Sequence, residues 1–122
     1  FWLEPGRYIV GEAGIIITRV TQLKEKGNNH YIGVEVGMNT LIRPALYDAF
    51  HEIINISRYH KSNIQNVTIV GPVCESGDKL GINRNFPLTF EGDTILIGNT
   101  GAYVRSMASN YNLREIPKEV II

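Results

Sequence analysis

The segment of residues 71–78, GPVCESGD, places the only cysteine, Cys74, directly before a carboxylate, Glu75, among residues that favour turns. Reactive cysteines occupy polar and partly exposed surroundings, whereas most free cysteines are buried as small hydrophobes. Residues 67–70 are a run rich in β-branched side chains, typical of a buried strand, so we expect the thiol and the acid at a strand end. The alternative is a half-buried cysteine in a surface turn, and the octapeptide alone favours that alternative.

Two arginines and two tyrosines stand where they could bind an anion. Arg43 and Tyr47 are four residues apart in a predicted helix and share a face, and a guanidinium with a phenol hydroxyl suits a carboxylate. Arg7 follows a proline and a glycine and would project from a turn, and Tyr103 follows small residues that let a ligand approach the backbone. A solvated arginine or a core tyrosine is the plainer interpretation of each residue, and both interpretations stay open.

The other residue types predict no further chemistry. His30, His51 and His60 have neither the spacing nor the company of a zinc site, so we expect no metal. The serines do not lie in the sequence context of a serine hydrolase. No lysine has the apolar setting that would lower its pKa, so a cofactor held through an amine would need a lysine outside this chain.

The composition excludes several classes of protein. The 122 residues include 12 basic and 12 acidic side chains with no basic run, so nucleic acid is not an expected partner. The hydrophobic fraction is 43% and the apolar runs are short, so no membrane span is expected. A single cysteine fits a reducing compartment, and we predict a cytoplasmic protein. Both ends look like the middle of a strand, so we interpret the chain as a fragment of a longer polypeptide.

Short β-branched runs separated by glycine-rich turns predict a mainly β, Greek-key-like barrel or sandwich with two short helices. Residues 15–23 and 31–36 are predicted strands that pair through a hairpin at residues 26–29. Further strands are expected at residues 67–70, 94–98 and 118–122, with residues 53–57 as another candidate.

The expected helices follow from a change of period. Leu46, Phe50 and Ile53 recur at helical spacing and predict a helix within residues 39–54 with these three on its apolar face. A second helix is expected within residues 102–110. Residues 4–7 are predicted to form a turn, and residues 80–87 are predicted to be irregular.

In this order along the chain, six segments resemble the C-terminal domain of the diaminopimelate decarboxylase family, whose enzymes use pyridoxal phosphate and have an alanine-racemase-like, fold type III architecture. These segments are EPGR at residues 4–7, GMNTLIRPALY at 37–47, GPVCESGD at 71–78, GAY at 101–103, SNYN at 109–112 and EV at 119–120. They cover nearly the whole chain, and the ordered set is specific although each motif alone is weak. Residues 1–7 and 43–54 further resemble the form fused behind an aspartate kinase.

The resemblance implies roles for individual residues. Glu4 would pair with the pyridine nitrogen of the cofactor, and Gly6 and Arg7 would lie at the cofactor site. Arg7 and Arg43, with Tyr47, would hold the far carboxylate of the substrate, meso-2,6-diaminopimelate.

The remaining implied roles belong to three residues. Glu75 would bind the far ammonium of the substrate, and Tyr103 would reach both cofactor and substrate. Cys74 would be the general acid that protonates the α-carbon after carbon dioxide leaves, giving L-lysine.

The family also implies the surroundings of this chain. Its enzymes carry an N-terminal (β/α)₈ barrel with the lysine that anchors pyridoxal phosphate, so residues 1–7 would end that barrel and cross over. Residues 8–122 would be the β-barrel domain, truncated at both ends and inactive alone. The family forms homodimers with shared active sites, in which Cys74 and Glu75 would enter the partner subunit's site.

Two alternatives remain. A sister decarboxylase acting on ornithine, arginine or carboxynorspermidine shares the EPGR turn and a cysteine followed by an acid. Arg43 and Tyr47 argue against it because those substrates carry a cationic tail. The isolated chain could also be a non-catalytic dimerisation module.

Overall fold

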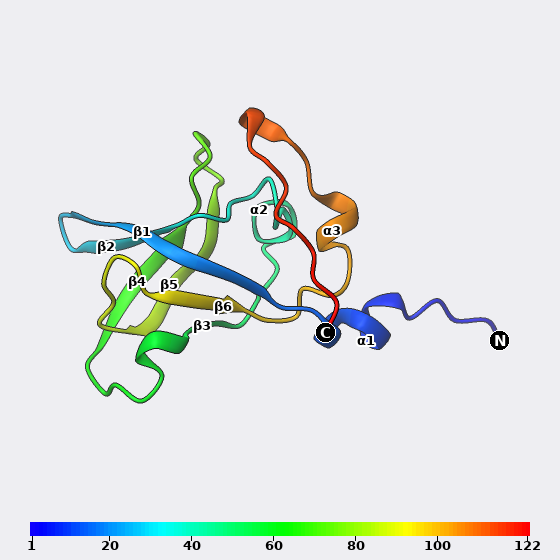
Figure 1. The fold of residues 1–122 in the computed structure, drawn as a ribbon, viewed down its shortest axis with the longest axis horizontal. Coiled ribbons are helices and arrows are strands. Elements are labelled where there is room, and N and C mark those ends of the chain that lie inside the picture. The colour runs from blue at the N-terminus through cyan, green and yellow to red at the C-terminus, as the bar shows by residue number, and fades with distance from the viewer.

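A six-stranded sheet dominates the computed structural model, which describes all residues from 1 to 122. The strand order across the sheet is β3-β6-β1-β2-β4-β5 (Figure 1). The strands are β1 (Ile16–Lys26), β2 (Asn29–Val34), β3 (Ile53–Asn55), β4 (Ile64–Val70), β5 (Lys79–Pro87) and β6 (Thr94–Ile97).

The long strand β1 joins the two halves of the sheet. Its first four residues pair antiparallel with β6, and the remainder pairs antiparallel with β2, with an irregular register between Val20 and Gln22. Gly27 turns the β1–β2 hairpin with a positive φ of 60°, which glycine adopts without strain. The hairpin and the strands predicted on either side of it are therefore confirmed, whereas the parallel pairing of β2 with β4 follows from the crossover between them.

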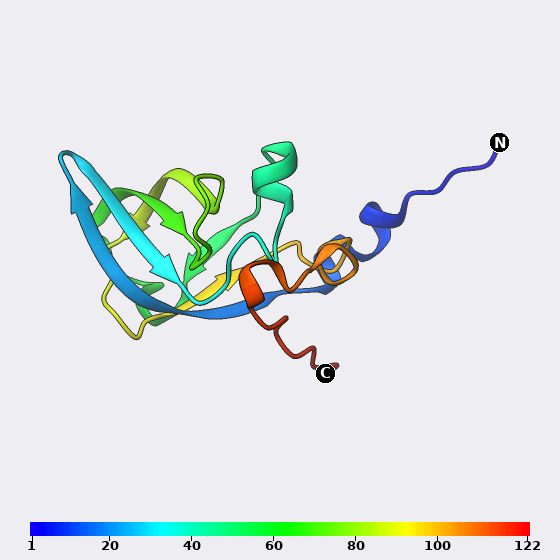
Figure 2. The same cartoon turned by 90° about the horizontal axis from the view of Figure 1, so that it is seen from above.

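The sheet curls until its two edge strands approach each other. Gly81 of β5 lies so close to β3 that a Cβ atom there would be 3.1 Å from Ile53 Cδ1. Arg84 of β5 donates a hydrogen bond from Nη2 to the backbone oxygen of His51, 3.0 Å away, just before β3. The second view shows the resulting strongly bent sheet (Figure 2). This nearly closed, barrel-like architecture confirms the predicted mainly β fold.

The core lies inside this curved sheet. Every strand contributes at least one buried apolar side chain, and alternation along β4 buries Val67 and Ile69. The cluster consists of Val20, Ile32, Val34, Leu41, Ile53, Val67, Ile69, Leu80, Phe86, Ile95, Ile97 and Val104.

The helical segments are short and lie outside the sheet. They are α1 (Gly6–Val10), α2 (Arg43–Tyr47) and α3 (Val104–Met107), with single 3₁₀ turns η1 (Gly11–Ala13), η2 (Ile56–Arg58) and η3 (Tyr111–Leu113). The two predicted helices correspond to α2 and α3 but are shorter than expected. A third, α1, starts within the predicted turn at residues 4–7. No helix is long and apolar enough to cross a membrane.

The helix predicted within residues 39–54 was wrong in its extent. It ends at Asp48, which takes a left-handed conformation with φ 53°, so the residues beyond it leave the helical face. Leu46 and Phe50 are 54% and 67% exposed, and only Ile53 of the predicted apolar face is in the core, as part of β3.

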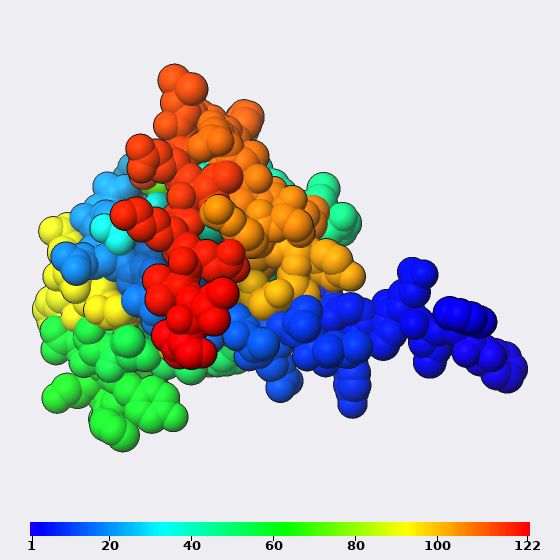
Figure 3. All heavy atoms as spheres, turned by 45° about the vertical axis from the view of Figure 1, so that its right-hand side comes forward, coloured from blue at the N-terminus to red at the C-terminus, as the bar shows by residue number.

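Two more predictions about elements were wrong. Residues 80–87 were expected to be irregular but form most of β5. The hydrogen bonds of the antiparallel pairing with β4 stabilise this strand, although its polar residues do not predict one. Residues 118–122 were expected to be a strand but belong to no strand and are exposed. The space-filling view shows this last segment running over the surface and the N-terminal residues projecting from the body (Figure 3).

Candidate functional site

Two arginines and two tyrosines from separate elements come together in what we call the arginine cluster: Arg7, Arg43, Tyr47 and Tyr103. The guanidinium carbon of Arg7 lies 5.4 Å from the ring centroid of Tyr103, and that of Arg43 lies 5.4 Å from the ring of Tyr47. Burial, followed by the charge of Arg7, lowers the pKa of Arg43 below its ordinary value. The fold therefore brings α1, α2 and the loop before α3 together at one place.

Glycines make this assembly possible. The N–H of Gly101 donates to the oxygen of Gly11 and the N–H of Thr100 donates to the oxygen of Gly14, both at 2.9 Å. A Cβ atom on Gly101 would collide with the oxygen of Val10, so the two backbones can cross only without a side chain there. This crossing fixes α1 against the loop that carries Tyr103.

Tyr103 adopts an unusual backbone conformation at the start of α3. Its φ is 63°, in the left-handed region that non-glycine residues seldom occupy. Its hydroxyl lies against Gly6, where a Cβ atom would be 2.8 Å away. The conformation thus directs the phenol towards the start of α1, beside Arg7, and Tyr103 is half exposed rather than part of the core.

The positive charges of the arginine cluster have no acidic partner. The ion pairs of the chain join Glu25 to His30, Arg58 to Asp93 and Arg105 to Glu119, and none includes Arg7 or Arg43. Arg43 is half-buried, and its Nε is fully buried without a hydrogen-bond partner. Two neighbouring cations with unused donors are suited to an anion, and a carboxylate matches the planar fork of a guanidinium.

The loop of residues 71–78 is held by the buried carboxylate of Asp78. Its Oδ1 accepts a hydrogen bond from the N–H of Met38 at 2.7 Å, and its Oδ2 accepts one from the N–H of Val73 at 2.6 Å. Burial raises the pKa of Asp78, and these two hydrogen bonds oppose that increase. Gly71 packs directly on Gly37, where any Cβ would collide with backbone. No pattern in the sequence marks Asp78 for this role.

Cys74 is exposed at the tip of this loop, so the half-buried alternative was wrong. The neighbouring Glu75 accepts a hydrogen bond from the hydroxyl of Tyr111, which raises the pKa of that tyrosine. The loop also flanks α2, because a Cβ on Gly77 would be 3.9 Å from Ala45 Cβ. No hydrogen bond or ion pair connects Cys74 or Glu75 to the arginine cluster, so one chain presents two separate parts of the predicted site.

Glu4 precedes α1 and is exposed, while the N–H of Gly6 donates to the oxygen of Glu4 at 2.9 Å. The free carboxylate therefore lies two residues from the bare backbone against which Tyr103 rests. No group of three or more histidine, cysteine, aspartate or glutamate side chains is placed to hold a metal ion.

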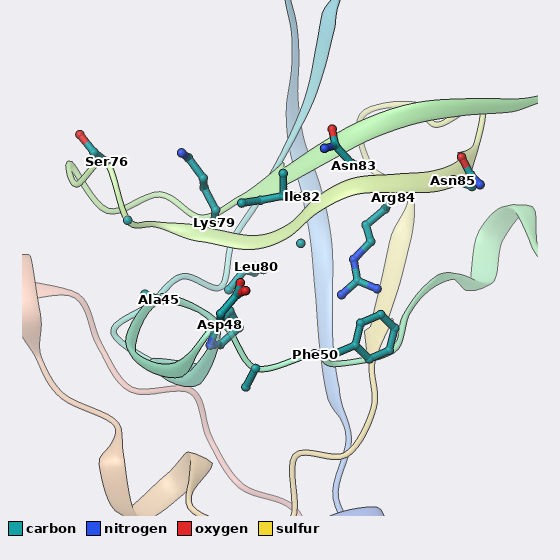
Figure 4. Close-up of a pocket in the computed structure, with 14 residues that line it drawn as sticks. Ala45, Asp48, Phe50, Ser76, Lys79, Leu80, Ile82, Asn83, Arg84 and Asn85 are labelled. Atoms are coloured by element: carbon teal, nitrogen blue, oxygen red, sulfur yellow. The ribbon is translucent and has the colours of Figure 1, made fainter.

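A separate surface pocket of about 630 Å³ lies between α2 and β5. Its lining includes Lys79 and Arg84, and the guanidinium of Arg84 stacks over the ring of Phe50 at 3.9 Å (Figure 4). Neither the arginine cluster nor Cys74 lines it, so the predicted chemistry lies elsewhere.

His51, for which the sequence predicts no chemistry, is buried. This residue is 1% exposed and lies in the segment between α2 and β3, outside any helix. Its spacing, four residues after Tyr47 and eight after Arg43, was the available signal. Because α2 ends at Asp48, His51 does not continue the helical face of Arg43 and Tyr47.

The chain is a barrel-like β-domain, and its arginine cluster has the charge and the unused donors that suit an anion. The sequence pattern described as the C-terminal sheet domain of pyridoxal-dependent decarboxylases matches residues 7–101, and the chain belongs to this family. The predicted family and fold are thereby confirmed.

Curated relatives are similar over nearly the whole chain. A diaminopimelate decarboxylase of Neisseria meningitidis is 48% identical over 122 residues, covering 98% of this chain and 29% of the relative. One from Aquifex aeolicus is 44% identical over 120 residues, covering 98% of this chain and 28% of the relative. A crystal structure of diaminopimelate decarboxylase from M. jannaschii in complex with L-lysine superposes with a TM-score of 0.87 at 40% identity, covering 93% of this chain and 26% of that one. This chain thus corresponds to less than a third of these relatives.

Proposed function

We propose that this chain is the C-terminal domain of a pyridoxal-phosphate-dependent diaminopimelate decarboxylase, which converts meso-2,6-diaminopimelate to L-lysine and carbon dioxide. The observation that carries the proposal is the pair of guanidiniums, Arg7 and Arg43, that lie together without an acidic partner. Diaminopimelate differs from lysine and ornithine by a carboxylate at its far end, and an uncompensated arginine pair favours that group over a cationic tail. The names of the similar enzymes support the same substrate.

The residues near α1 fit pyridoxal phosphate. Gly6 offers bare backbone beside the hydroxyl of Tyr103, and the exposed Glu4 carboxylate has no ion-pair partner and can accept a hydrogen bond from a protonated pyridine nitrogen. When bound, the cofactor supplies a ring that accepts electrons as carbon dioxide leaves. In the proposal, Glu4, Gly6, Arg7 and Tyr103 hold the cofactor, and its anchoring lysine belongs to another part of the polypeptide.

The arginine cluster positions the substrate. Arg43 and Arg7 bind the far carboxylate, and the Tyr47 hydroxyl adds a hydrogen bond while its ring keeps Arg43 in place. The conformation of Tyr103 presents its ring under Arg7, so one phenol stabilises the guanidinium and borders the cofactor. The reacting end of the substrate is thereby held at a distance from the arginine cluster that equals the length of the substrate.

Cys74 and Glu75 complete the site from a second subunit in this proposal. Their loop is tied down by Asp78, and the hydroxyl of Tyr111 orients the Glu75 carboxylate, which would bind the far ammonium. Cys74 would donate a proton to the α-carbon. Since no hydrogen bond or ion pair joins either residue to the arginine cluster of its own chain, a homodimer with shared sites accounts for both parts.

The proposal also assigns the rest of the polypeptide. An N-terminal (β/α)₈ barrel would carry the lysine, with residues 1–7 as the crossover and residues 8–122 as the β-domain. The short share of each relative that the chain covers supports a large additional domain.

The test is a substrate comparison in the full-length enzyme. We expect release of carbon dioxide from meso-diaminopimelate, and much slower release from L-lysine and L-ornithine. Replacing Arg43 with Met should raise the KM for diaminopimelate about 10²-fold, since truncating one partner of a desolvated charge pair costs roughly 2–5 kcal/mol. The control is Arg105→Met, which removes an exposed arginine outside the cluster and should leave KM unchanged. Turnover of ornithine in preference to diaminopimelate would overturn the assignment.

A further inference from the structure

One ring nitrogen of His51 is hydrogen-bonded, and the other has no hydrogen-bond partner. Its Nδ1 lies 3.0 Å from the backbone oxygen of Gly98. A carbonyl oxygen only accepts hydrogen bonds, so Nδ1 carries the proton and Nε2 presents a lone pair. That Nε2 is fully buried and has no hydrogen-bond partner.

The ring of His51 is kept neutral by its surroundings. Burial lowers its pKa most, the bond to Gly98 acts in the opposite direction, and the charges of Arg43, Arg7 and Arg84 lower it further. These cations belong to α2, α1 and β5. Arg84 is itself fixed there, since it donates to the His51 oxygen and stacks on Phe50, the preceding residue (Figure 4).

The unpartnered nitrogens of His51 and Arg43 are complementary. Arg43 Nε and His51 Nε2 are the two buried side-chain nitrogens of the chain without a partner, the first a donor and the second an acceptor. Among the charges that act on His51, that of Arg43 is the strongest. Buried polar groups are rarely left unpaired, and a donor and an acceptor in one neighbourhood can satisfy each other.

We propose that His51 is a positioning residue for Arg43, accepting a hydrogen bond from the Arg43 Nε–H through one bridging water molecule, since neither nitrogen has a direct partner in the structure. The bond fixes the plane of the guanidinium. Both terminal nitrogens of Arg43 remain free for the far carboxylate of the substrate, so His51 contributes to selection of a dicarboxylate. Neutrality is essential to this role, because a protonated ring would add another positive charge and lose the acceptor. The inference rests on the proposed function for its substrate, but the His51–Arg43 link does not.

Two substitutions separate this role from simple packing. His51→Leu retains much of the volume and removes the acceptor, whereas His51→Gln places an amide oxygen near the position of Nε2. In the full-length enzyme we expect His51→Leu to raise the KM for diaminopimelate about tenfold with kcat within about threefold, and His51→Gln to restore most of the loss. His60→Leu, at an exposed histidine, is the matched control and should change neither constant.

A double-mutant cycle gives the decisive comparison. Arg43→Lys keeps the charge but has no Nε–H, so adding His51→Leu to it should raise KM no further. Equal effects of His51→Leu in both backgrounds would overturn the inference, as would equal losses in His51→Leu and His51→Gln with unchanged folding.

A spectroscopic measurement decides the link independently of substrate. When this chain is labelled with ¹⁵N-arginine, the Arg43 Nε proton should exchange slowly with solvent in the wild type and in His51→Gln. In His51→Leu the same proton should lose this protection and exchange faster. Unaltered protection in His51→Leu would refute the hydrogen bond. If the full-length enzyme prefers another substrate while this protection behaves as expected, the proposed function fails and the His51–Arg43 link stands.

Discussion

Asp93 makes a concentrated set of interactions for a single carboxylate, and replacing it with Asn tests what holds the corner between η2 and β6. Its Oδ2 accepts hydrogen bonds from Asn55 Nδ2 and from the N–H of Phe90, both at 3.0 Å, and Arg58 Nε donates to both carboxylate oxygens, at 3.3 Å to Oδ1 and 3.2 Å to Oδ2. The side chain of Asp93 is 7% exposed and that of Arg58 is 33% exposed. An asparagine can place its one oxygen at the Oδ2 position, but its amide nitrogen then faces Arg58.

The magnitude follows from what the amide loses. A hydrogen bond to a charged group contributes about 1.5–3 kcal/mol, and the partial exposure of Arg58 reduces its share to about 1 kcal/mol. The other two bonds survive in neutral form, each weaker by about 0.5–1 kcal/mol. We therefore expect Asp93→Asn to lower the free energy of unfolding by about 2–3 kcal/mol at pH 7.

The effect should depend on pH with a definite sign. Burial by itself would raise the pKa of Asp93, but the bonds from Asn55, Phe90 and Arg58 outweigh it and hold that pKa below its ordinary value of 3.8. The stabilisation is thus fully present above pH 3.8 and is lost as the pH falls through the lower native pKa. The difference between wild type and Asp93→Asn should shrink over that acid range.

Urea unfolding of this chain measures both expectations. With a slope of about 1–3 kcal/mol per molar urea, the midpoint of Asp93→Asn should fall by about 1 M or more at pH 7. Asp48→Asn is the matched control, because Asp48 is exposed in a left-handed conformation that asparagine also accepts. Midpoints for the two variants that agree within error, or a difference from wild type that does not change in acid, would refute this account of the corner.

Three further outcomes are expected. In the full-length enzyme, Cys74→Ala should lower kcat about 10²–10⁴-fold with a smaller effect on KM, and unchanged kcat would remove the thiol from the mechanism. Gly101→Ala, by forcing α1 away from Tyr103, should lower kcat/KM for diaminopimelate about 10²-fold, whereas an unshifted crystal structure of the variant would contradict the crossing argument. Gly71→Ala should destabilise this chain in urea by about 3 kcal/mol because its Cβ meets the backbone of Gly37, and Gly77→Ala, with its Cβ 3.9 Å from Ala45, should stay within about 0.5 kcal/mol.

The sequence alone was enough for the class of fold, the family and most of the candidate residues. Strands such as β1, β4 and β6 are rich in β-branched residues, and Gly27 sits where the hairpin needs a positive φ, so local chemistry signals these elements. Motifs such as EPGR and GPVCESGD depend on residue identity and order, which the sequence states directly.

Tertiary structure decided the features that depend on partners distant in the chain. β5 carries polar residues and becomes a strand by pairing with β4, and the expected helix stops at Asp48 so that the chain can enter β3. The meeting of Arg7 with Tyr103 depends on a backbone crossing at Gly101, and the nitrogens Arg43 Nε and His51 Nε2 lack partners because the folded chain removes both atoms from water. Burial and pairing across long sequence separations are properties of the folded chain, because they arise from contacts that no local pattern encodes.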